Sequence, residues 1–423
     1  MIKKIFVLFL VNLFILNNSL SYSQEFLSLD SLIREAKENN PQIKAAKKRW
    51  EAALARIPIS KSFDNPTVGF SFMKIQKGTL KLDRTMPEDR VLLISQMIPL
   101  FGKLSLKGKI ALVESQMTAS EYKGKELEII NLVKNAYYDL FLNYKEIELK
   151  QISLEFLKGI AKIAEAKYIT GEISQEELFK INLEIAKLSN EIENLRQENK
   201  AKQTYLNTLL NRDPEDQVGI PDLKEDITFD KDIKSLYQLT LLNQPELLIL
   251  SYAIEKNKYA KALVKRSFFP DLMTEIGLRG FTSGGIGPWD LMLAFSLPFW
   301  FWTKQRYEIK EAIFNLEEAE VAYKAMQNKA FGEVKDLFTK IKISQNKIGL
   351  YKNNLIPLLE FSIETSLTGF RSGKGDLMLL LDTERMLIET KMDYYKALVE
   401  YNMNLADLER TVGVDLREVK NEK

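Results

Sequence analysis

The sequence predicts a mainly α-helical fold with some β-structure, in which one unit built on a long antiparallel helical hairpin occurs twice. Three observations lead to this prediction: landmarks that recur at a near-constant spacing, helical segments of unusual length, and four short segments of alternating polarity. The first copy covers residues 24–220 and the second covers residues 221–423. Each copy is expected to contain a short helix, two strands and a helical hairpin, in that order.

The internal repeat rests on a series of matching landmarks. Asn39-Asn40-Pro41 is matched by Asn243-Gln244-Pro245, and the prolines of this pair are 204 residues apart. Pro66 and Pro270, which end two further similar segments, have the same separation. Three more pairs follow at nearly the same offset: Ile98-Pro99 with Leu297-Pro298, Asp139-Leu140-Phe141 with Asp336-Leu337-Phe338, and Gly171 with Gly373. This constancy indicates two copies of one unit.

A short helix opens each copy. Leu29–Ile57 has helical periodicity, Ser28 can cap its start, and Pro58 is expected to end it. Its counterpart runs from about Ile233 to Val264. The segment Asn211–Asp232 is rich in Asp, Glu, Pro and Gly and lacks periodicity, so it is expected to be a connector between the copies.

Long helical hairpins are expected over residues 103–210 and 303–413. Hydrophobic residues in the first hairpin recur three and four positions apart, which is the spacing of a coiled coil. They include Ile130, Val133, Tyr137, Leu140, Tyr144 and Ile147. An ordinary bundle core would explain one such stripe, but the stretch Lys103–Tyr168 has no proline and corresponds to roughly 100 Å of helix. Gly171 and Gly373 interrupt the two runs and are the expected hairpin turns.

Four segments alternate with a period of two, as β-strands do. They cover about residues 66–73, 90–98, 270–281 and 289–297. In the third segment, Leu272, Ile276 and Leu278 share one face. The opposite faces of the third and fourth segments carry charged residues, among them Glu275, Arg279 and Asp290. The register of the second segment is less clear, because that segment is apolar on both faces for several residues.

These segments are interpreted as membrane strands. A tilted strand crosses a bilayer in about 9–11 residues, which is close to the length of each segment. Aromatic residues crowd the strand ends, as they do at a membrane interface: Trp289, Phe299, Trp300, Phe301 and Trp302. The charged faces would then line a watery lumen. A soluble sandwich with one wet face is the alternative interpretation of the same alternation.

Four strands cannot close a barrel by themselves. Every backbone group in lipid must be hydrogen-bonded, so an open sheet edge is not tolerated. Several chains must therefore pool their strands, eight from two chains or twelve from three, and physical reasoning alone prefers neither. The long helices continue from the strand ends and are expected to extend the same tube outside the membrane.

Residues 1–23 have the pattern of a signal peptide for export. Lys3-Lys4 precede an apolar run, and small residues follow at Ser21-Tyr22-Ser23. The chain contains no cysteine, so we expect no disulfide, no thiolate chemistry and no acceptor for an N-terminal lipid. The mature protein is therefore expected to be exported and not lipid-anchored.

Composition also argues against catalysis and nucleic-acid binding. The chain contains no histidine, which removes the commonest general base and the commonest metal ligand. No nucleophile elbow, phosphate loop or metal constellation is recognisable, so we expect no catalytic, cofactor or metal-binding residues and no enzyme activity. The net charge is +2 and no basic block is present, so no nucleic-acid partner is expected.

Several of these segments together resemble the outer-membrane efflux protein family, of which TolC is the best-known member. The resemblance is carried by the export signal, the duplication, the paired strands and Asn39-Asn40-Pro41 after a short helix. It is also carried by Gln96-Met97-Ile98-Pro99-Leu100-Phe101-Gly102-Lys103, Tyr168-x-x-Gly171 and Phe370-Arg371-Ser372-Gly373. The stretch from Pro99 to Lys103 is similar to the CzcC-like branch, which serves cation-efflux pumps. The resemblance covers nearly the whole mature chain.

The resemblance implies a channel in the outer membrane of a Gram-negative bacterium. In this family three copies build a shared β-barrel of twelve strands, four from each chain. Their helices form a tunnel into the periplasm, whose tip docks on a periplasmic adaptor (membrane fusion) protein and an inner-membrane efflux pump. Small molecules or metal cations would pass passively through the lumen, and the pump would supply the energy.

The resemblance also points to residues at the tip. In this family, acidic residues six and nine positions after the second hairpin glycine narrow the tunnel. Here these positions hold Leu379, which departs from the pattern, and Asp382, which matches it. Asp376 is a candidate substitute for the missing carboxylate. The corresponding region of the first copy carries Glu172, Glu176 and Glu177, which are expected to form a solvated acidic tip or a surface for docking the adaptor.

Two questions stay open at this point. An exported coiled-coil adaptor or scaffold without membrane strands would share the export signal and the long helices, so it is the alternative to a channel. The cargo is also undetermined, because the residues allow export of drugs, metals or proteins. Without histidine and cysteine, a metal cargo would pass through rather than be held.

Overall fold

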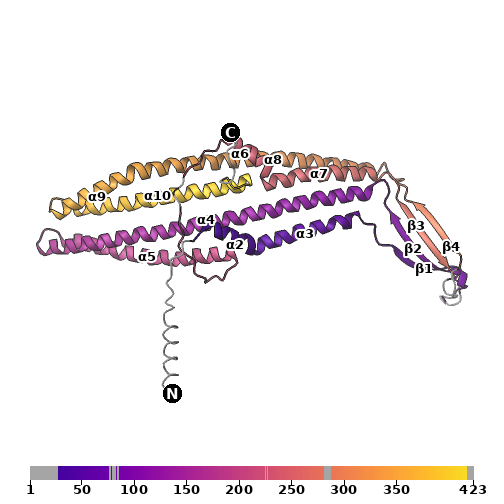
Figure 1. The fold of residues 1–423 in the computed structure, drawn as a ribbon, viewed down its shortest axis with the longest axis horizontal. Helices are drawn as coiled ribbons and strands as arrows, with labels where there is room; N and C mark the ends of the chain where they lie inside the picture. The colour runs from indigo at the N-terminus through magenta and orange to yellow at the C-terminus, as the bar shows by residue number, and fades with distance from the viewer. Residues whose placement is uncertain are drawn as a thin grey trace, which may run out of the picture. The chain divides into compact units, whose positions relative to one another are not determined.

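The computed structural model describes residues 27–75, 78, 82, 85–223, 225, 227–280 and 287–416. The predicted signal peptide lies outside the described residues, as do parts of the loops after the first and third strands. The helices are α2 (Leu29–Asn39), α3 (Pro41–Lys61), α4 (Lys103–Ile169), α5 (Gln175–Leu210), α6 (Ile233–Asn243), α7 (Pro245–Arg266), α8 (Gln305–Leu350), α9 (Ile356–Arg371) and α10 (Leu377–Val412) (Figure 1). The strands are β1 (Thr67–Phe72), β2 (Arg90–Ile98), β3 (Leu272–Arg279) and β4 (Trp289–Phe295).

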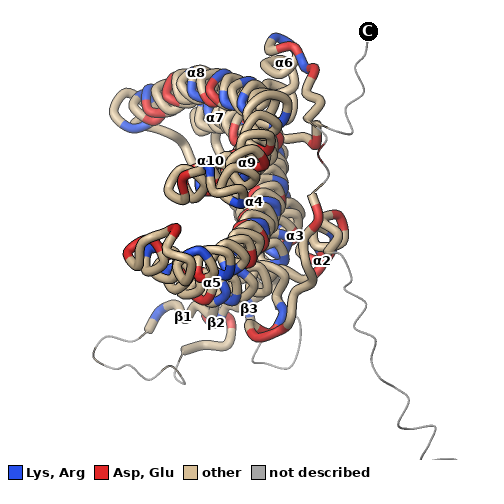
Figure 2. The backbone as a smooth tube through the Cα atoms, turned by 90° about the vertical axis from the view of Figure 1, so that its left-hand side faces the viewer, with Lys and Arg blue, Asp and Glu red and all other residues tan. Residues whose placement is uncertain are grey.

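The chain forms two compact units, and each unit takes segments from both halves of the sequence. Unit 1 contains Met1–Asn40, Ile129–Asp230 and Leu337–Asp407, and unit 2 contains Pro41–Glu128, Lys231–Asp336 and Leu408–Lys423. The helices α4, α8 and α10 contribute residues to both units. Acidic and basic residues are distributed along the helices and do not gather in one block of a single sign (Figure 2).

The four strands of unit 2 form one antiparallel sheet in the order β1-β2-β3-β4. The predicted strands are therefore present, and each half of the sequence supplies two neighbouring ones. The pairing of β2 with β3 joins the two halves, with Ile94 opposite Ile276 and Ile98 opposite Leu272. This pairing assigns β2 its register, which its own sequence left unclear.

Each predicted short helix is in fact two helices, separated at the residue before a proline. The break falls at Asn40-Pro41 in the first half and at Gln244-Pro245 in the second. Asn40 has φ −60° and ψ 124°, and Gln244 has nearly the same values, −64° and 120°. A proline disfavours the helical conformation in the residue that precedes it, so the earlier helix must end there.

Pro58 lies inside α3 and does not end it, so this prediction was wrong. The helix continues for three residues beyond the proline, as far as Lys61. A proline within a helix removes one backbone hydrogen bond and crowds the preceding turn. Pro58 therefore costs α3 one backbone hydrogen bond near its C-terminal end without ending the helix.

The two helical hairpins have turns with the same backbone conformation. Gly171 lies between α4 and α5 with φ +74°, and Gly373 lies between α9 and α10 with φ +73°. After α4 and after α9, a backbone N–H donates to a carbonyl in the last turns of the helix. Glu172 donates to Lys167 at 2.8 Å, and Lys374 donates to Gly369 at 3.0 Å. This αL ending suits glycine, because a side chain is strained in that region.

The second hairpin is not continuous, although a long helical stretch was predicted over residues 303–413. A π-helical turn, η3 (Tyr351–Leu355), separates α8 from α9, and Pro357 lies at the start of α9. A proline cannot donate its backbone nitrogen, so the wider hydrogen-bonding pattern of the π-turn accommodates it. The first hairpin has no proline at the corresponding place, and α4 is a single helix of 67 residues.

Candidate functional site

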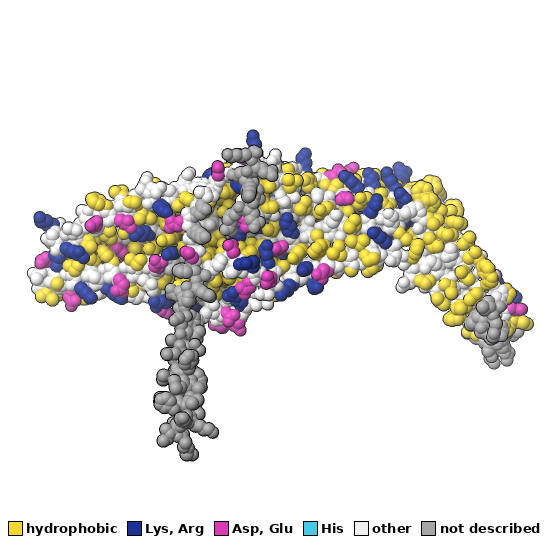
Figure 3. All heavy atoms as spheres, viewed as in Figure 1, with side chains coloured by type: hydrophobic (Ala, Val, Ile, Leu, Met, Phe, Trp, Pro, Cys, Tyr) yellow, Lys and Arg dark blue, Asp and Glu magenta, His cyan; other side chains and the backbone are white. Residues whose placement is uncertain are grey.

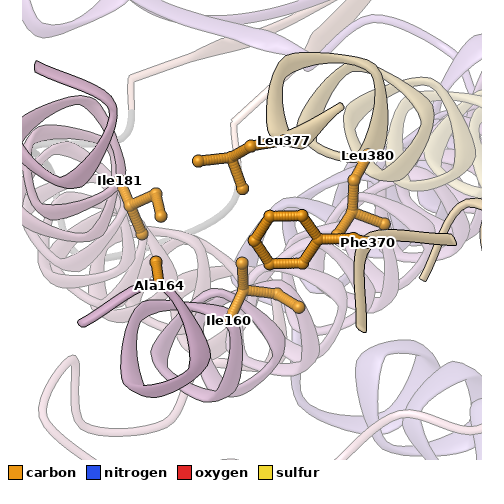
Figure 4. Close-up of a cluster of buried hydrophobic side chains, with 6 residues drawn as sticks. All are labelled: Ile160, Ala164, Ile181, Phe370, Leu377 and Leu380. Atoms are coloured by element: carbon orange, nitrogen blue, oxygen red, sulfur yellow. The ribbon is translucent and has the colours of Figure 1, made fainter. Parts of the chain in front are cut away.

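The tip of unit 1 is formed where the turns of both helical hairpins meet. Hydrophobic side chains from α4, α5, α9 and α10 make one buried cluster there (Figure 4). Its members are Ile160, Ala164, Ile181, Phe370, Leu377 and Leu380. Lys167 reaches across from α4, with its Nζ 5.6 Å from the centre of the Phe370 ring. The two hairpins are therefore held together at this end by apolar packing and by a cation–π contact.

The three gate candidates predicted from the resemblance lie at the start of α10 but in different environments. Oδ1 of Asp376 accepts a hydrogen bond of 2.8 Å from the backbone N–H of Met378, so this carboxylate caps the helix. Leu379 is 59% exposed. Asp382 is also exposed, and its Oδ1 lies 2.9 Å from the guanidinium of Arg385. All three residues are exposed, but the carboxylate of Asp376 is engaged by the helix backbone and that of Asp382 by a side chain.

One exposed stripe of α10 continues from these residues, and it was not identified from the sequence. Its members recur three and four positions apart: Leu379, Asp382, Met386, Glu389, Asp393, Lys396 and Glu400. The stripe is mainly acidic, and its single cation, Lys396, lies 3.7 Å from Asp393. The same spacing in the sequence could have revealed it, because positions three and four apart share a helix face.

The acidic residues of the first hairpin turn all have partners within the tip. Glu172 pairs with Lys167 at 2.6 Å, and this hydrogen bond lowers the pKa of its carboxyl. Glu176 pairs with Lys180 at 3.0 Å. Glu177 forms a capping box with Ser174, whose hydroxyl accepts from the Glu177 backbone at 3.2 Å. These three residues lie together at the surface of the tip.

Sequence reasoning missed a buried carboxyl in the same region. Glu384 on α10 is 6% exposed, although Asp382 two positions earlier is open to solvent. It lines a cavity of about 480 Å³ between α4, α5 and α10. Burial raises the pKa of the Glu384 carboxyl, and a hydrogen bond with Ser153 on α4 opposes this effect. Its Oε1 has no hydrogen-bond partner among the described residues.

The sheet of unit 2 has two chemically different faces. The strand registers place the following apolar residues on one face: Val68, Phe70, Leu92, Ile94, Ile98, Leu272, Ile276, Leu278, Trp289, Leu291, Leu293 and Phe295. Gln96 and Thr274 lie among them, and Arg90 lies at one end. Many of these side chains are more than half exposed, and Figure 3 shows hydrophobic side chains gathered over the sheet at the right of the view.

The opposite face of the sheet carries the charges that the sequence predicted there. Glu275 lies opposite Ser95 on one side and Met292 on the other. Arg279 and Asp290 form an ion pair of 2.6 Å. The two faces of the sheet therefore suit different surroundings, one apolar and one wet.

None of the helices in the described part of the chain is long and apolar enough to cross a membrane. The described residues also include no group of three or more acidic, histidine or cysteine side chains that could hold a metal ion.

Solved structures share this architecture of helical hairpins joined to a small sheet. The outer-membrane channel CmeC of Campylobacter jejuni superposes with a TM-score of 0.75 at 18% identity, covering 94% of this chain and 91% of CmeC. The MtrE outer-membrane channel of Neisseria gonorrhoeae superposes with a TM-score of 0.76 at 16% identity, covering 93% of this chain and 91% of MtrE. CusC, whose structures concern transmembrane channel formation, superposes with a TM-score of 0.75 at 17% sequence identity. The match covers 91% of this chain and 92% of CusC. The fold is therefore that of outer-membrane channels.

The family follows from the sequence comparison. The model of the family described as outer membrane efflux protein matches residues 32–212 and 236–414, so the chain belongs to this family and the predicted resemblance is confirmed. The probable outer membrane lipoprotein SilC of Salmonella typhimurium is 23% identical over 90% of this chain and 85% of its own length. The cobalt-zinc-cadmium resistance protein CzcC of Cupriavidus metallidurans is 21% identical over 92% of this chain and 90% of its own length.

Proposed function

We propose that the protein is the outer-membrane duct of a tripartite efflux system in a Gram-negative bacterium. The observation that carries the proposal is the exposed apolar face of an open four-stranded sheet whose outer strands, β1 and β4, have no partner strand on one side among the described residues. Such a face is stable in lipid, but unpaired edges in lipid are costly. Copies of the chain would therefore join edge to edge, and three copies would supply the twelve strands of a closed barrel.

In such a barrel the wet face of the sheet lines the lumen. Glu275, Arg279 and Asp290 would then lie along the water-filled path. The helical hairpins would continue the path into the periplasm, where their tips would meet a periplasmic adaptor and an inner-membrane pump. Because the chain would only conduct, transport energy would come from the pump.

We place the constriction of this duct at the start of α10. Leu379 and Asp382 are exposed neighbours on one helix face, and symmetry would bring their copies together around the axis. Leucine side chains can close a pore by excluding water, whereas a ring of carboxylates favours cations. Asp376 is less suited to this role, because its carboxylate caps α10.

We further propose metal cations as the cargo. The relatives support this choice, since CzcC is named for resistance to cobalt, zinc and cadmium. The acidic stripe on α10 also supports it, because carboxylates attract cations without the tight binding that imidazole and thiolate ligands would give. A metal would therefore be conducted through the duct as a substrate.

A charge placed on the apolar face of the sheet tests the membrane assignment. Phe295→Asp would put a carboxylate against lipid, and we expect it to abolish assembly into the outer membrane. Met292→Asp is the matched control, because Met292 lies on the same strand but on the face that carries Glu275. The measurement is the amount of heat-sensitive oligomer in the outer-membrane fraction.

Two outcomes of this experiment would contradict the proposal. If Phe295→Asp assembles as well as Met292→Asp does, the apolar face does not meet lipid. If the unmodified protein is a soluble monomer, an exported coiled-coil adaptor or scaffold becomes the better description. Ion conductance of the purified protein in planar bilayers provides the second readout for the duct itself.

A further inference from the structure

The turn between β4 and α8 exposes four consecutive aromatic side chains. The exposed fractions are 67% for Phe299, 68% for Trp300, 50% for Phe301 and 52% for Trp302. Aromatic rings of this size normally contribute to cores and interfaces, so such an exposed group needs an apolar or interfacial neighbour. We call residues Phe299–Trp302 the aromatic turn.

The aromatic turn is held in a defined shape. The backbone carbonyl of Trp300 accepts hydrogen bonds from the N–H groups of Thr303 at 3.1 Å and Lys304 at 2.9 Å. The ring of Trp302 contacts the ring of Phe301 edge to face, with centroids 4.7 Å apart, and it also contacts the ring of Trp300 at 6.2 Å. The rings are therefore presented by a structured turn whose backbone is fixed by its own hydrogen bonds.

Two cations, Lys304 and Arg306, lie shortly after the aromatic turn in the sequence. Lys304 and Arg306 are exposed, and no carboxylate among the described residues forms an ion pair with either. The corresponding position in the first half behaves differently. Lys103, the first cation after Pro99, is 9% exposed, and its Nζ lies 2.8 Å from both Oδ1 of Asp271 and the carbonyl of Phe269. The first half uses its lysine internally, whereas the second half leaves Lys304 available.

The chemistry changes in a fixed order along this part of the chain. The apolar face of β4 ends with Phe295, and Leu297 beyond it is 57% exposed. The aromatic turn comes next, and Lys304 and Arg306 come last. A membrane leaflet has the same order with depth: acyl chains, then the interface that tryptophan prefers, then charged headgroups.

From this order we infer that the aromatic turn together with Lys304 and Arg306 forms a binding site for an anionic phospholipid headgroup. The rings lie at the level of the lipid glycerol and carbonyl groups, and the two cations contact the negatively charged headgroup. This inference rests on the proposed function, because it requires the apolar face of the sheet to lie in a membrane. A phospholipid fits better than a protein partner, because the aromatic surface is continuous with the lipid-facing surface of β4.

The test uses the full-length protein in nonionic detergent, with fluorescence from the two tryptophans of the turn. Trp50→Phe and Trp289→Phe remove the other tryptophans, so the signal comes from Trp300 and Trp302. Brominated phosphatidylglycerol or brominated phosphatidylcholine is then added, and quenching is measured against lipid mole fraction. We expect half-maximal quenching at a roughly thirtyfold lower fraction of the anionic lipid, as two cations near a charged headgroup would give.

A paired substitution isolates the cations. K304Q/R306Q should bring the phosphatidylglycerol curve onto the phosphatidylcholine curve. The control K324Q/K329Q removes the same charge from α8, about 30 Å further along the helix, and should keep the preference.

The possible outcomes separate the inference from the proposed function. Equal quenching by both lipids in the unmodified background would overturn the headgroup site but leave membrane insertion intact. Quenching by neither lipid in a protein that still conducts in bilayers would mean that something other than lipid covers the turn. Quenching by neither lipid in a protein that also fails to form oligomers would instead count against the duct itself.

Discussion

Glu384 lies two positions beyond Asp382 on α10, but its side chain is directed into unit 1 while Asp382 faces solvent. Four basic residues line the same cavity, and each is paired with a carboxylate other than that of Glu384: Lys150, Lys180, Lys187 and Arg385. Lys150 is paired with Glu191 at 2.8 Å, and Lys187 is paired with Glu184 at 3.4 Å. Among the described residues, the hydrogen bond with Ser153 is the contact that favours the charged form of Glu384. Burial therefore raises the pKa of the Glu384 carboxyl in the folded protein above its ordinary value.

The raised pKa of Glu384 predicts that rising pH weakens the packing of α10 against α4. A carboxyl whose pKa is higher in the folded than in the unfolded chain stabilises the fold below its ordinary pKa of 4.5. That contribution is lost as the pH rises through the folded-state value, because the folded protein must then bury a charge. Glu384→Gln stays neutral, so its thermal stability should fall less than that of the unmodified protein as the pH rises from 4.5 towards neutrality.

A matched control separates this effect from a general effect of charge on α10. Asp382→Asn removes a carboxylate at an exposed position of the same helix turn and should leave the pH dependence unchanged. Thermal unfolding of the three proteins over this pH range is the measurement. Parallel pH profiles for the unmodified protein and Glu384→Gln would show that Glu384 does not contribute to the dependence.

At the scale of elements, the two hairpin turns could be predicted from the sequence. Gly171 and Gly373 interrupt the two helical runs and match each other in the predicted repeat. Gly171 has φ +74°, a conformation that costs a side-chain-bearing residue about 1–2 kcal/mol. Gly171→Ala should therefore lower the free energy of unfolding by about that amount. Gly159 provides the comparison, since it lies within α4 and a Cβ built there meets no atom within 4 Å.

Gly159→Ala should stabilise the protein by about 0.5–1 kcal/mol, because alanine is the better residue within a helix. Denaturant unfolding of both variants would measure the two changes. Effects of the same sign would contradict the assignment of Gly171 to an αL position that only glycine adopts without strain.

Interruptions of the helices were harder to predict than the helices themselves. The residues before Pro41 and Pro245 leave the helical region, whereas Pro58 remains inside α3 and Pro357 is accommodated by a π-turn. A proline inside a helix removes one backbone hydrogen bond, whereas a proline at the first helical position removes none. Whether the helix ends, continues or widens depends on what packs around that turn, which a local sequence pattern does not contain.

At the scale of the whole molecule, the proposed assembly would turn the α10 stripe into a property of the pore. Three copies of Asp382, Glu389 and Asp393 around one axis would give a cation-attracting path. The triple substitution D382N/E389Q/D393N should therefore lower the ratio of cation to anion permeability severalfold. The measurement is the reversal potential in planar bilayers under a salt gradient.

The control for this prediction removes acidic residues from a different helix. E184Q/E193Q neutralises two exposed positions on α5 and should leave the reversal potential near its original value. An unchanged reversal potential in the α10 variant would place the stripe outside the conducting path. It would also remove the main structural support for a cation cargo.

The sequence by itself determined the elements with local periodicity, namely the strands and the long helices whose hydrophobic residues recur three and four positions apart. It also determined the glycines at the hairpin turns. These could be predicted because side-chain direction within a strand or helix follows from backbone geometry alone. The tertiary structure decided what depends on distant partners. The pairing of β2 with β3 gave β2 its face, and Ser153 and the surrounding helices buried Glu384 while Asp382 stayed exposed. These features come from segments far apart in the chain, so only their packing in space could establish them.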